Sequence, residues 1–262
     1  MQVLVKGRAI ECIVEGPETA PCITLSHGVA LDLTMWDPLV TRLRGRYRIL
    51  RYNSRGHGLS DLGRSGFELS DLAQDVVALL DLLGISTTHY VGLSMGGMVG
   101  LGLALHHSDR LKSVAICNAR GSATTEYRES WSKRVELVRA HGIEAIVESS
   151  IERWFTPEFR AENQQVISNV KSIIRRMSPD AYCCNAAALQ RLDYVRYLGA
   201  IKVPSLFMTG EQDNGAPPAI VREMQVATPF SRYREIARAS HISAMEQPDI
   251  FTQAIVDFIN EC

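Results

Sequence analysis

The chain has 262 residues, of which 46% are hydrophobic and 22% are charged, and its formal net charge is −1 at pH 7. This length suits one large domain, or a domain with an inserted subdomain, and it allows a sizeable apolar core. The near-zero charge gives no electrostatic reason to expect nucleic acid or an anionic membrane as a partner. The first residues lack the features of a signal peptide, and no apolar stretch approaches the roughly 20 residues that a membrane span needs.

The six cysteines predict reduced thiols in a cytoplasmic protein. Most of them lie within apolar runs, and no C-x-x-C pair is present. A vicinal disulfide between Cys183 and Cys184 is the less favoured alternative. The sequence contains no cofactor motif and no cluster with the spacing of metal ligands, so we expect neither a cofactor nor a metal.

The first half of the chain alternates short apolar strands with helical patterns. Strands are expected at residues 3–5, 9–14, 22–26, 48–52, 88–91 and 111–117, the first two forming an edge hairpin. Helices are expected at 37–43, 70–83 and 98–105. Asp37 and Ser70 are the predicted N-caps of the first two, and Gly84 ends the second. This alternation is typical of a largely parallel sheet with helices on both faces.

The pattern changes to helices alone from about Thr125 to Tyr197. The helical segments expected there include residues 130–140, 143–152 and 180–190. Strands return at residues 203–208 and 231–236, with a helix from Pro217 between them and a last helix at 248–259. We therefore predict a helical cap, residues 123–198, inserted into a core that is formed by residues 1–122 and 199–262.

A glycine-rich turn in the middle of the chain carries the candidate nucleophile, Ser94. The run Gly92-Leu93-Ser94-Met95-Gly96 follows a strand pattern and precedes an apolar helical pattern, which is the setting of a nucleophile elbow. Such a turn exposes the serine hydroxyl, and glycines remove the Cβ atoms that would clash where strand and helix crowd together. The helix N-terminus also presents free backbone N–H groups to developing negative charge. An incidental serine is the alternative, which the flanking strand and helix disfavour.

The turn His27-Gly28-Val29 follows an earlier strand and is expected near this elbow. The backbone N–H groups of Val29 and Met95 are therefore the candidate oxyanion donors. For the His27 side chain, a hydrogen bond to the turn is favoured over proton transfer.

The loop at residues 53–60 follows the 48–52 strand. It lacks the Gly-Lys-Ser/Thr of a phosphate loop, and no helix begins directly after it. Within it, Arg55 and His57 are expected to pin the loop rather than to shape a pocket.

Asp213 and His241 complete the candidate catalytic set with Ser94. Each follows a predicted strand, in the chain order nucleophile, acid, histidine. A serine hydroxyl is a poor nucleophile unless a neutral imidazole takes its proton, and a buried carboxylate fixes the tautomer of that imidazole and stabilises its cation. Glu211 is the rival acid in the same loop, whereas the residues after the sixth strand, Asn118-Ala119-Arg120, offer no carboxylate.

Phrases spread over most of the chain resemble 3-oxoadipate enol-lactonases of the α/β-hydrolase superfamily. Many hydrolases of this fold share the phrases at 26–28 with 32–37, and at 54–60, 91–98 and 241–248. The phrases at 129–134 and 153–157 are more discriminating, because they lie in the predicted cap. The resemblance implies an α/β-hydrolase fold with a mostly parallel, eight-stranded sheet. It also implies hydrolysis of a small carboxylated enol-lactone in the catabolism of aromatic compounds.

A carboxylated substrate requires a cation in the pocket. Arg134 is the candidate, because a guanidinium binds a carboxylate through two hydrogen bonds, and Trp131 and Trp154 are the expected apolar walls. A solvated Arg134, with the tryptophans in the core of the cap, is an alternative of equal weight.

Two departures from the family pattern leave other substrates open. The turn at His27 lacks its usual second glycine, since Ala30 stands there, and the acid loop after Asp213 also differs. The alternatives are a carboxylesterase, an amide or C–C bond hydrolase, and a non-catalytic receptor of the same fold. In each case we expect a small-molecule partner, and both a monomer and a homo-oligomer are compatible with the sequence.

Overall fold

A single mostly parallel sheet organises the computed structural model, which describes residues 1–262. Its eight strands lie in the order β1-β2-β4-β3-β5-β6-β7-β8. The strands are β1 (Gln2–Val5), β2 (Arg8–Glu15), β3 (Cys22–Ser26), β4 (Arg48–Tyr52), β5 (Thr88–Leu93), β6 (Leu111–Cys117), β7 (Ser205–Gly210) and β8 (Ser231–Ile236). β2 pairs antiparallel with β1 and β4, and all other neighbours pair in parallel. The expected strands and edge hairpin are confirmed.

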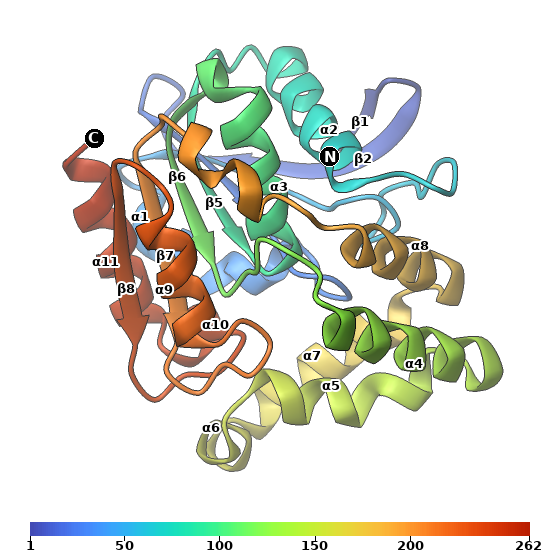
Figure 1. The fold of residues 1–262 in the computed structure, drawn as a ribbon. Coiled ribbons are helices and arrows are strands. Elements are labelled where there is room, and N and C mark those ends of the chain that lie inside the picture. The colour runs from blue at the N-terminus through green and yellow to red at the C-terminus, as the bar shows by residue number, and fades with distance from the viewer.

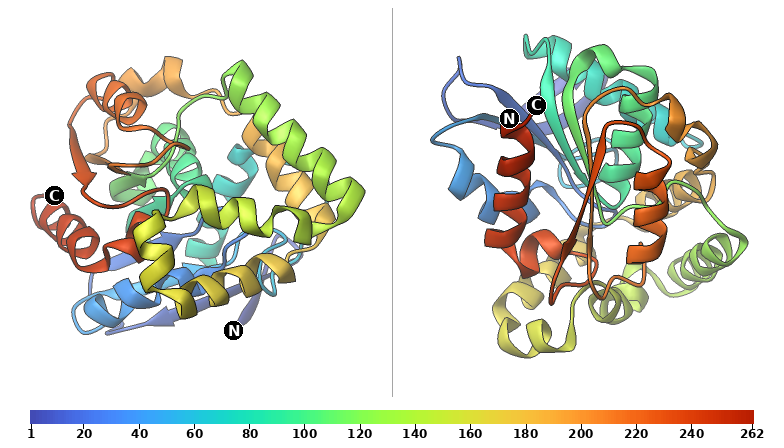
Figure 2. Two further views of the ribbon diagram at one scale, coloured as in Figure 1. Left: turned by 90° about the horizontal axis from the view of Figure 1, so that it is seen from below. Right: turned by 60° about the vertical axis from the view of Figure 1, so that its left-hand side comes forward.

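Helices cover both faces of this sheet (Figures 1 and 2). The first face carries α1 (Asp37–Leu43) and α11 (Pro248–Asn260), which pack against each other. The second face carries α2 (Leu69–Leu82), α3 (Met95–His106) and α9 (Pro218–Val226). Because both faces are covered, β3, β5 and β7 are buried at every position.

Five further helices follow β6 and precede β7 in the chain. They are α4 (Thr125–His141), α5 (Val147–Trp154), α6 (Pro157–Glu162), α7 (Gln164–Arg176) and α8 (Pro179–Gln190). We call them the helical layer; it lies beyond the carboxyl ends of the strands (Figure 1 and Figure 2, left). A run of helices was expected here, although α6 and α7 were not. None of the helices of the structure has the length and apolar character needed to cross a membrane.

The prediction of Asp37 as an N-cap is wrong. Helix α1 includes Asp37 as its first residue, with Trp36 as the N-cap and Pro38 in the first turn. The carboxylate of Asp37 forms an ion pair with Arg51 on β4. The Asp37 side chain, which the local pattern assigns to the helix cap, is therefore bound by Arg51 on the sheet instead.

The prediction of Ser70 as an N-cap is also wrong. Helix α2 begins one residue earlier, at Leu69, and Glu68 is its N-cap. The carboxylate of Asp71 accepts the backbone N–H of Glu68 at 2.8 Å, so a side chain inside the first turn stabilises this end. Gly84 does end the helix, with a φ of 64°.

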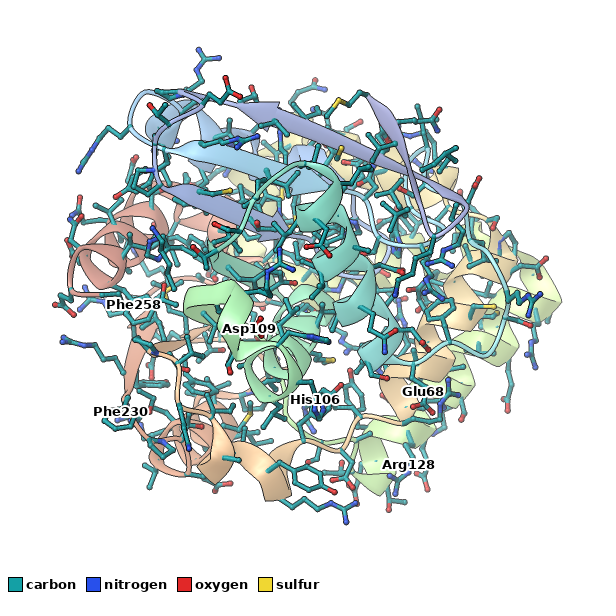
Figure 3. The ribbon with its side chains drawn as sticks, turned by 90° about the horizontal axis from the view of Figure 1, so that it is seen from above. Glu68, His106, Asp109, Arg128, Phe230 and Phe258 are labelled. Carbon is teal, nitrogen blue, oxygen red and sulfur yellow. The ribbon has the colours of Figure 1, made fainter.

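Phe230, just before β8, supports a test of backbone strain. It has a φ of 53°, where an L side chain costs about 1–2 kcal/mol, and 76% of the residue is exposed (Figure 3). Glycine removes this cost. It also stabilises the unfolded state by about 0.4–1 kcal/mol through its greater backbone entropy, which offsets part of the gain. Phe230→Gly should therefore raise the free energy of unfolding in urea by about 0.5 kcal/mol.

Val226→Gly is the matched control. Val226 is 78% exposed and ends α9, so glycine should lower the free energy of unfolding there. A loss of stability in Phe230→Gly as large as that of the control would contradict the strain assigned to Phe230.

Candidate active site

Ser94 lies on a strained turn between β5 and α3. Its φ of 55° and ψ of −114° are rarely adopted by residues other than glycine. A Cβ atom would lie 2.1 Å from the carbonyl oxygen of Gly96 if added at Gly92, and 2.2 Å from that of Ser26 if added at Gly96. Backbone atoms cannot move aside, so both positions require glycine. The expected elbow is present, and its helix begins at Met95 rather than at Met98.

Ser94, His241 and Asp213 form a continuous chain of hydrogen bonds. Nε2 of His241 lies 2.9 Å from Oγ of Ser94, and Nδ1 lies 3.0 Å from each carboxylate oxygen of Asp213. Because an ionised carboxylate only accepts, Nδ1 carries the ring proton and Nε2 is left to accept from the serine hydroxyl. All three residues are buried. This is the geometry that a serine nucleophile and its base require.

Asp213 is held as an anion by its surroundings. Its carboxylate accepts backbone N–H groups of Gly215 at 2.7 Å and Ala216 at 3.0 Å, and Nδ2 of Asn118 at 2.9 Å. Burial opposes ionisation, but the charge of His241 and these hydrogen bonds outweigh it and hold the pKa of Asp213 below its ordinary value. A negative charge therefore faces the imidazole on the side away from Ser94.

The rival acid, Glu211, has a different role. Its side chain is exposed, and Oε2 accepts the backbone N–H of Arg238 at 2.9 Å. Asn118 donates to Asp213, while its own Oδ1 accepts the hydroxyl of Ser243 at 2.6 Å. Asn118 therefore orients the carboxylate of Asp213, a role that the sequence analysis missed. Its left-handed φ of 51° cannot be recognised from the sequence.

The turn after β3 lies directly against Ser94. A Cβ atom on Gly28 would lie 3.3 Å from Cβ of Ser94. The backbone N–H of Val29 has no hydrogen-bond partner, and that of Met95 opens α3 and so has no acceptor within the helix. The two N–H groups that we expect to donate to an oxyanion therefore have no acceptor within their own turn or helix.

His27 fastens this turn to the loop after β4. Its Nδ1 lies 2.8 Å from the carbonyl oxygen of Gly28, and its Nε2 accepts the backbone N–H of Ser54 at 3.0 Å. Both ring nitrogens are engaged by backbone groups. The prediction that His27 holds the turn is confirmed.

His57 and Arg55 both hold the loop after β4 in place, as expected. Nε2 of His57 accepts the N–H of Ala30 at 3.0 Å, and Nδ1 faces the carbonyl oxygen of Arg55. The Arg55 guanidinium forms two hydrogen bonds, of 2.5 and 3.0 Å, with the carboxylate of Asp75. Burial and the neighbouring His27 lower the pKa of His57 to about 3. His57 is therefore neutral, and it stabilises Ala30, whose φ of 58° suits glycine.

A pocket opens at Ser94 between the sheet and the helical layer. Trp131, Arg134 and Trp154 all line it together with Ser94 and His241. The two tryptophans also belong to the buried core, and their role as apolar walls for a substrate stays a prediction. The sequence analysis missed three further lining residues from the helical layer, namely Tyr127, Arg153 and Tyr182.

Arg134 is half-buried in this pocket rather than solvated. Its Nε donates to the hydroxyl of Tyr182 at 2.8 Å, and its terminal nitrogens donate to Oγ of Ser149 at 3.3 Å and of Ser150 at 2.5 Å. These partners are neutral hydroxyls, so the positive charge of Arg134 has no carboxylate counterion.

The His241 loop is tied to the helical layer. The backbone N–H of Ile242 donates to the carbonyl oxygen of Trp154 at 3.1 Å. The buried carboxylate of Glu246 accepts the N–H of Thr156 at 2.7 Å and its hydroxyl at 2.9 Å, and also the N–H of Ser240 at 2.5 Å. Hydrogen bonds from the residues directly before and after His241 thus join this loop to the end of α5, in part through Glu246.

Comparison with known proteins identifies the family. The model of the alpha/beta hydrolase fold matches residues 21–248. The chain belongs to this family. It is 32% identical to 3-oxoadipate enol-lactonase 1 of Acinetobacter baylyi over 254 residues, which cover 97% of this chain and 94% of that protein. The fold together with this similarity to an enol-lactonase supports a carboxylic-ester hydrolase.

Two other proteins are similar over nearly their whole length. The crystal structure of the enol-lactonase from Burkholderia xenovorans LB400 has a TM-score of 0.96 and 34% identity, and the alignment covers 99% of this chain and 100% of that one. A protein of Variovorax paradoxus named as a RutD carbamate hydrolase is 27% identical, with 94% of each chain covered. The expected α/β-hydrolase fold is confirmed.

The contacts of Asp213 and Glu211 predict opposite effects of removing each charge. Asp213→Asn should lower kcat for 4-nitrophenyl acetate by about 10⁴-fold, because the amide no longer favours the ring tautomer that accepts from Ser94. Glu211→Gln is the control and should retain most of kcat. A large loss in Glu211→Gln with little loss in Asp213→Asn would reverse the assignment of the acid.

The low pKa of His57 predicts an acid-sensitive fold. The unfolded state binds a proton near pH 6.5 while the folded state stays neutral down to about pH 3. This stabilisation is complete above pH 6.5 and decreases as the pH falls, by up to about 1.4 kcal/mol per pH unit. Urea unfolding between pH 7 and 5 should show a shallower dependence in His57→Gln.

His141→Gln provides the control for that measurement. His141 is exposed in the last turn of α4, so the pH dependence should match that of the unmodified chain. An unchanged slope in His57→Gln would contradict the neutral, buried role of His57.

Proposed function

We propose that the chain hydrolyses a small enol-lactone that bears a carboxylate, of the 3-oxoadipate enol-lactone type. The observation that carries this proposal is the pocket that joins Ser94 and His241 to Arg134, a half-buried cation without a carboxylate counterion. The similarity to 3-oxoadipate enol-lactonases along nearly the whole chain supports this substrate class. The reaction belongs to the β-ketoadipate pathway of aromatic catabolism in the cytoplasm.

Acylation follows from the hydrogen-bond chain at Ser94. Oγ of Ser94 attacks the lactone carbonyl carbon while Nε2 of His241 accepts the hydroxyl proton, across the 2.9 Å that separates them. Asp213 stabilises the imidazolium that forms. The backbone N–H groups of Val29 and Met95 donate to the oxyanion of the tetrahedral intermediate.

Collapse of the tetrahedral intermediate opens the ring. The C–O bond to the enol oxygen breaks, and this oxygen leaves readily because it is a weak base. The released enolate then takes the proton from the His241 imidazolium, which returns His241 to its neutral form. A water molecule then attacks the acyl-enzyme, with His241 accepting its proton, and the ring-opened acid is released as Ser94 regains its hydrogen.

The helical layer, within residues 123–198, acts as the cap that selects the substrate. It supplies Trp131 and Arg134 from α4 and Trp154 from α5, all lining the pocket. The remaining segments, 1–122 and 199–262, form the catalytic core. The tryptophans form apolar walls for the lactone ring, and Arg134 contributes positive charge for the carboxylate.

Spectrophotometric hydrolysis of 3-oxoadipate enol-lactone, beside neutral 4-nitrophenyl acetate, tests this function. Arg134→Ala should raise KM for the lactone by about 10-fold or more, since a hydrogen bond to a charged group contributes about 1.5–3 kcal/mol. Turnover of the acetate should change little, because it carries no carboxylate.

Arg139→Ala is the matched control, because Arg139 is exposed in the last turn of the same helix. It should behave as the unmodified enzyme toward both substrates. Turnover of the acetate without turnover of the lactone would overturn the lactonase function and leave the roles of Ser94, His241 and Asp213 standing.

A further inference from the structure

Arg153 on α5 lines the catalytic pocket without a polar partner of its own. It forms no ion pair and no hydrogen bond, and its Cζ lies over the ring of Trp131 at 5.8 Å from the centroid. The two other arginines of the pocket are engaged. Arg134 donates to three hydroxyls, and Nε of Arg120 donates to the carbonyl oxygen of Gly215 at 2.6 Å.

The groups that face Arg153 leave its charge uncompensated. Arg134 repels it, and the nearby hydroxyls of Tyr127 and Tyr182 are neutral. Asp213 is the acid within electrostatic range, but it already accepts from His241 and from backbone N–H groups. Burial, and next the charge of Arg134, lower the pKa of Arg153. A half-buried cation in this state is costly, and an anion in the pocket would stabilise it.

We propose that Arg153 binds the substrate carboxylate, which lies between its guanidinium and that of Arg134. This inference rests on the proposed function and adds a second anion-binding residue to it. The hydroxyls fix Arg134 in place and occupy three of its five N–H donors, whereas all the donors of Arg153 are free for the two carboxylate oxygens. The anion also relieves the repulsion between the two cations. The enzyme therefore selects acyl groups that carry a carboxylate over neutral ones of equal length.

A matched pair of esters tests this selection. The 4-nitrophenyl monoester of glutaric acid and 4-nitrophenyl pentanoate differ in that a terminal carboxylate replaces a methyl group. We expect Arg153→Met to lower kcat/KM for the glutarate monoester by about 10- to 100-fold and to leave the pentanoate within about twofold. Arg153→Lys should retain part of the preference, because it keeps the charge without the planar fork. Arg139→Met is the exposed control.

Thermal unfolding separates binding from a structural role. Because Arg153 has no hydrogen-bond or ion-pair partner in the fold, Arg153→Met should unfold at the same temperature as the unmodified enzyme or at a higher one. A lower unfolding temperature, with equal losses for both esters, would show a structural role and overturn the inference.

The esters also distinguish the two proposals. An unmodified enzyme that shows no preference for the glutarate monoester would overturn the proposed function, and the role of Arg153 with it. A preference that persists in Arg153→Met but disappears in Arg134→Met would overturn the role of Arg153 alone. Loss of the preference in Arg153→Met supports it.

Discussion

The close approach of α3 to the turn after β3 is the constraint on which the site depends. A side chain at Gly96 would collide with the carbonyl oxygen of Ser26, and the N–H of Gly96 instead donates to the carbonyl oxygen of His27 at 3.1 Å. This contact puts the turn that carries Val29 and the first N–H of the helix beside Ser94. A wider separation would move these two N–H groups away from Ser94, beside which a donor to an oxyanion must lie.

Local sequence patterns predict most of this architecture because the relevant signals are local. Ser94 and Asp213 each follow a strand that is recognisable from its apolar run and the turn residues after it, and His241 follows the more polar strand β8. The carboxyl ends of parallel strands meet at one edge of the sheet, so three residues far apart in the sequence must lie close together. Their chain order and strand positions are enough to predict the constellation without coordinates.

Features that depend on partners from other elements are not predictable in this way. The carboxylate of Asp37 resembles a helix cap, yet it pairs with Arg51 on a neighbouring strand. The sequence around Arg153 gives no sign of its role except that it precedes Trp154. That role depends on the lack of a counterion in the pocket, which becomes visible only in the folded chain.

The hydrogen bonds from Ile242 and Glu246 to the end of α5 have a consequence for substrate entry. Lifting α5 away from the sheet would strain the backbone directly after His241 and the loop directly before it. Substrate entry that keeps His241 beside Ser94 must therefore leave the α5 side of the pocket in place.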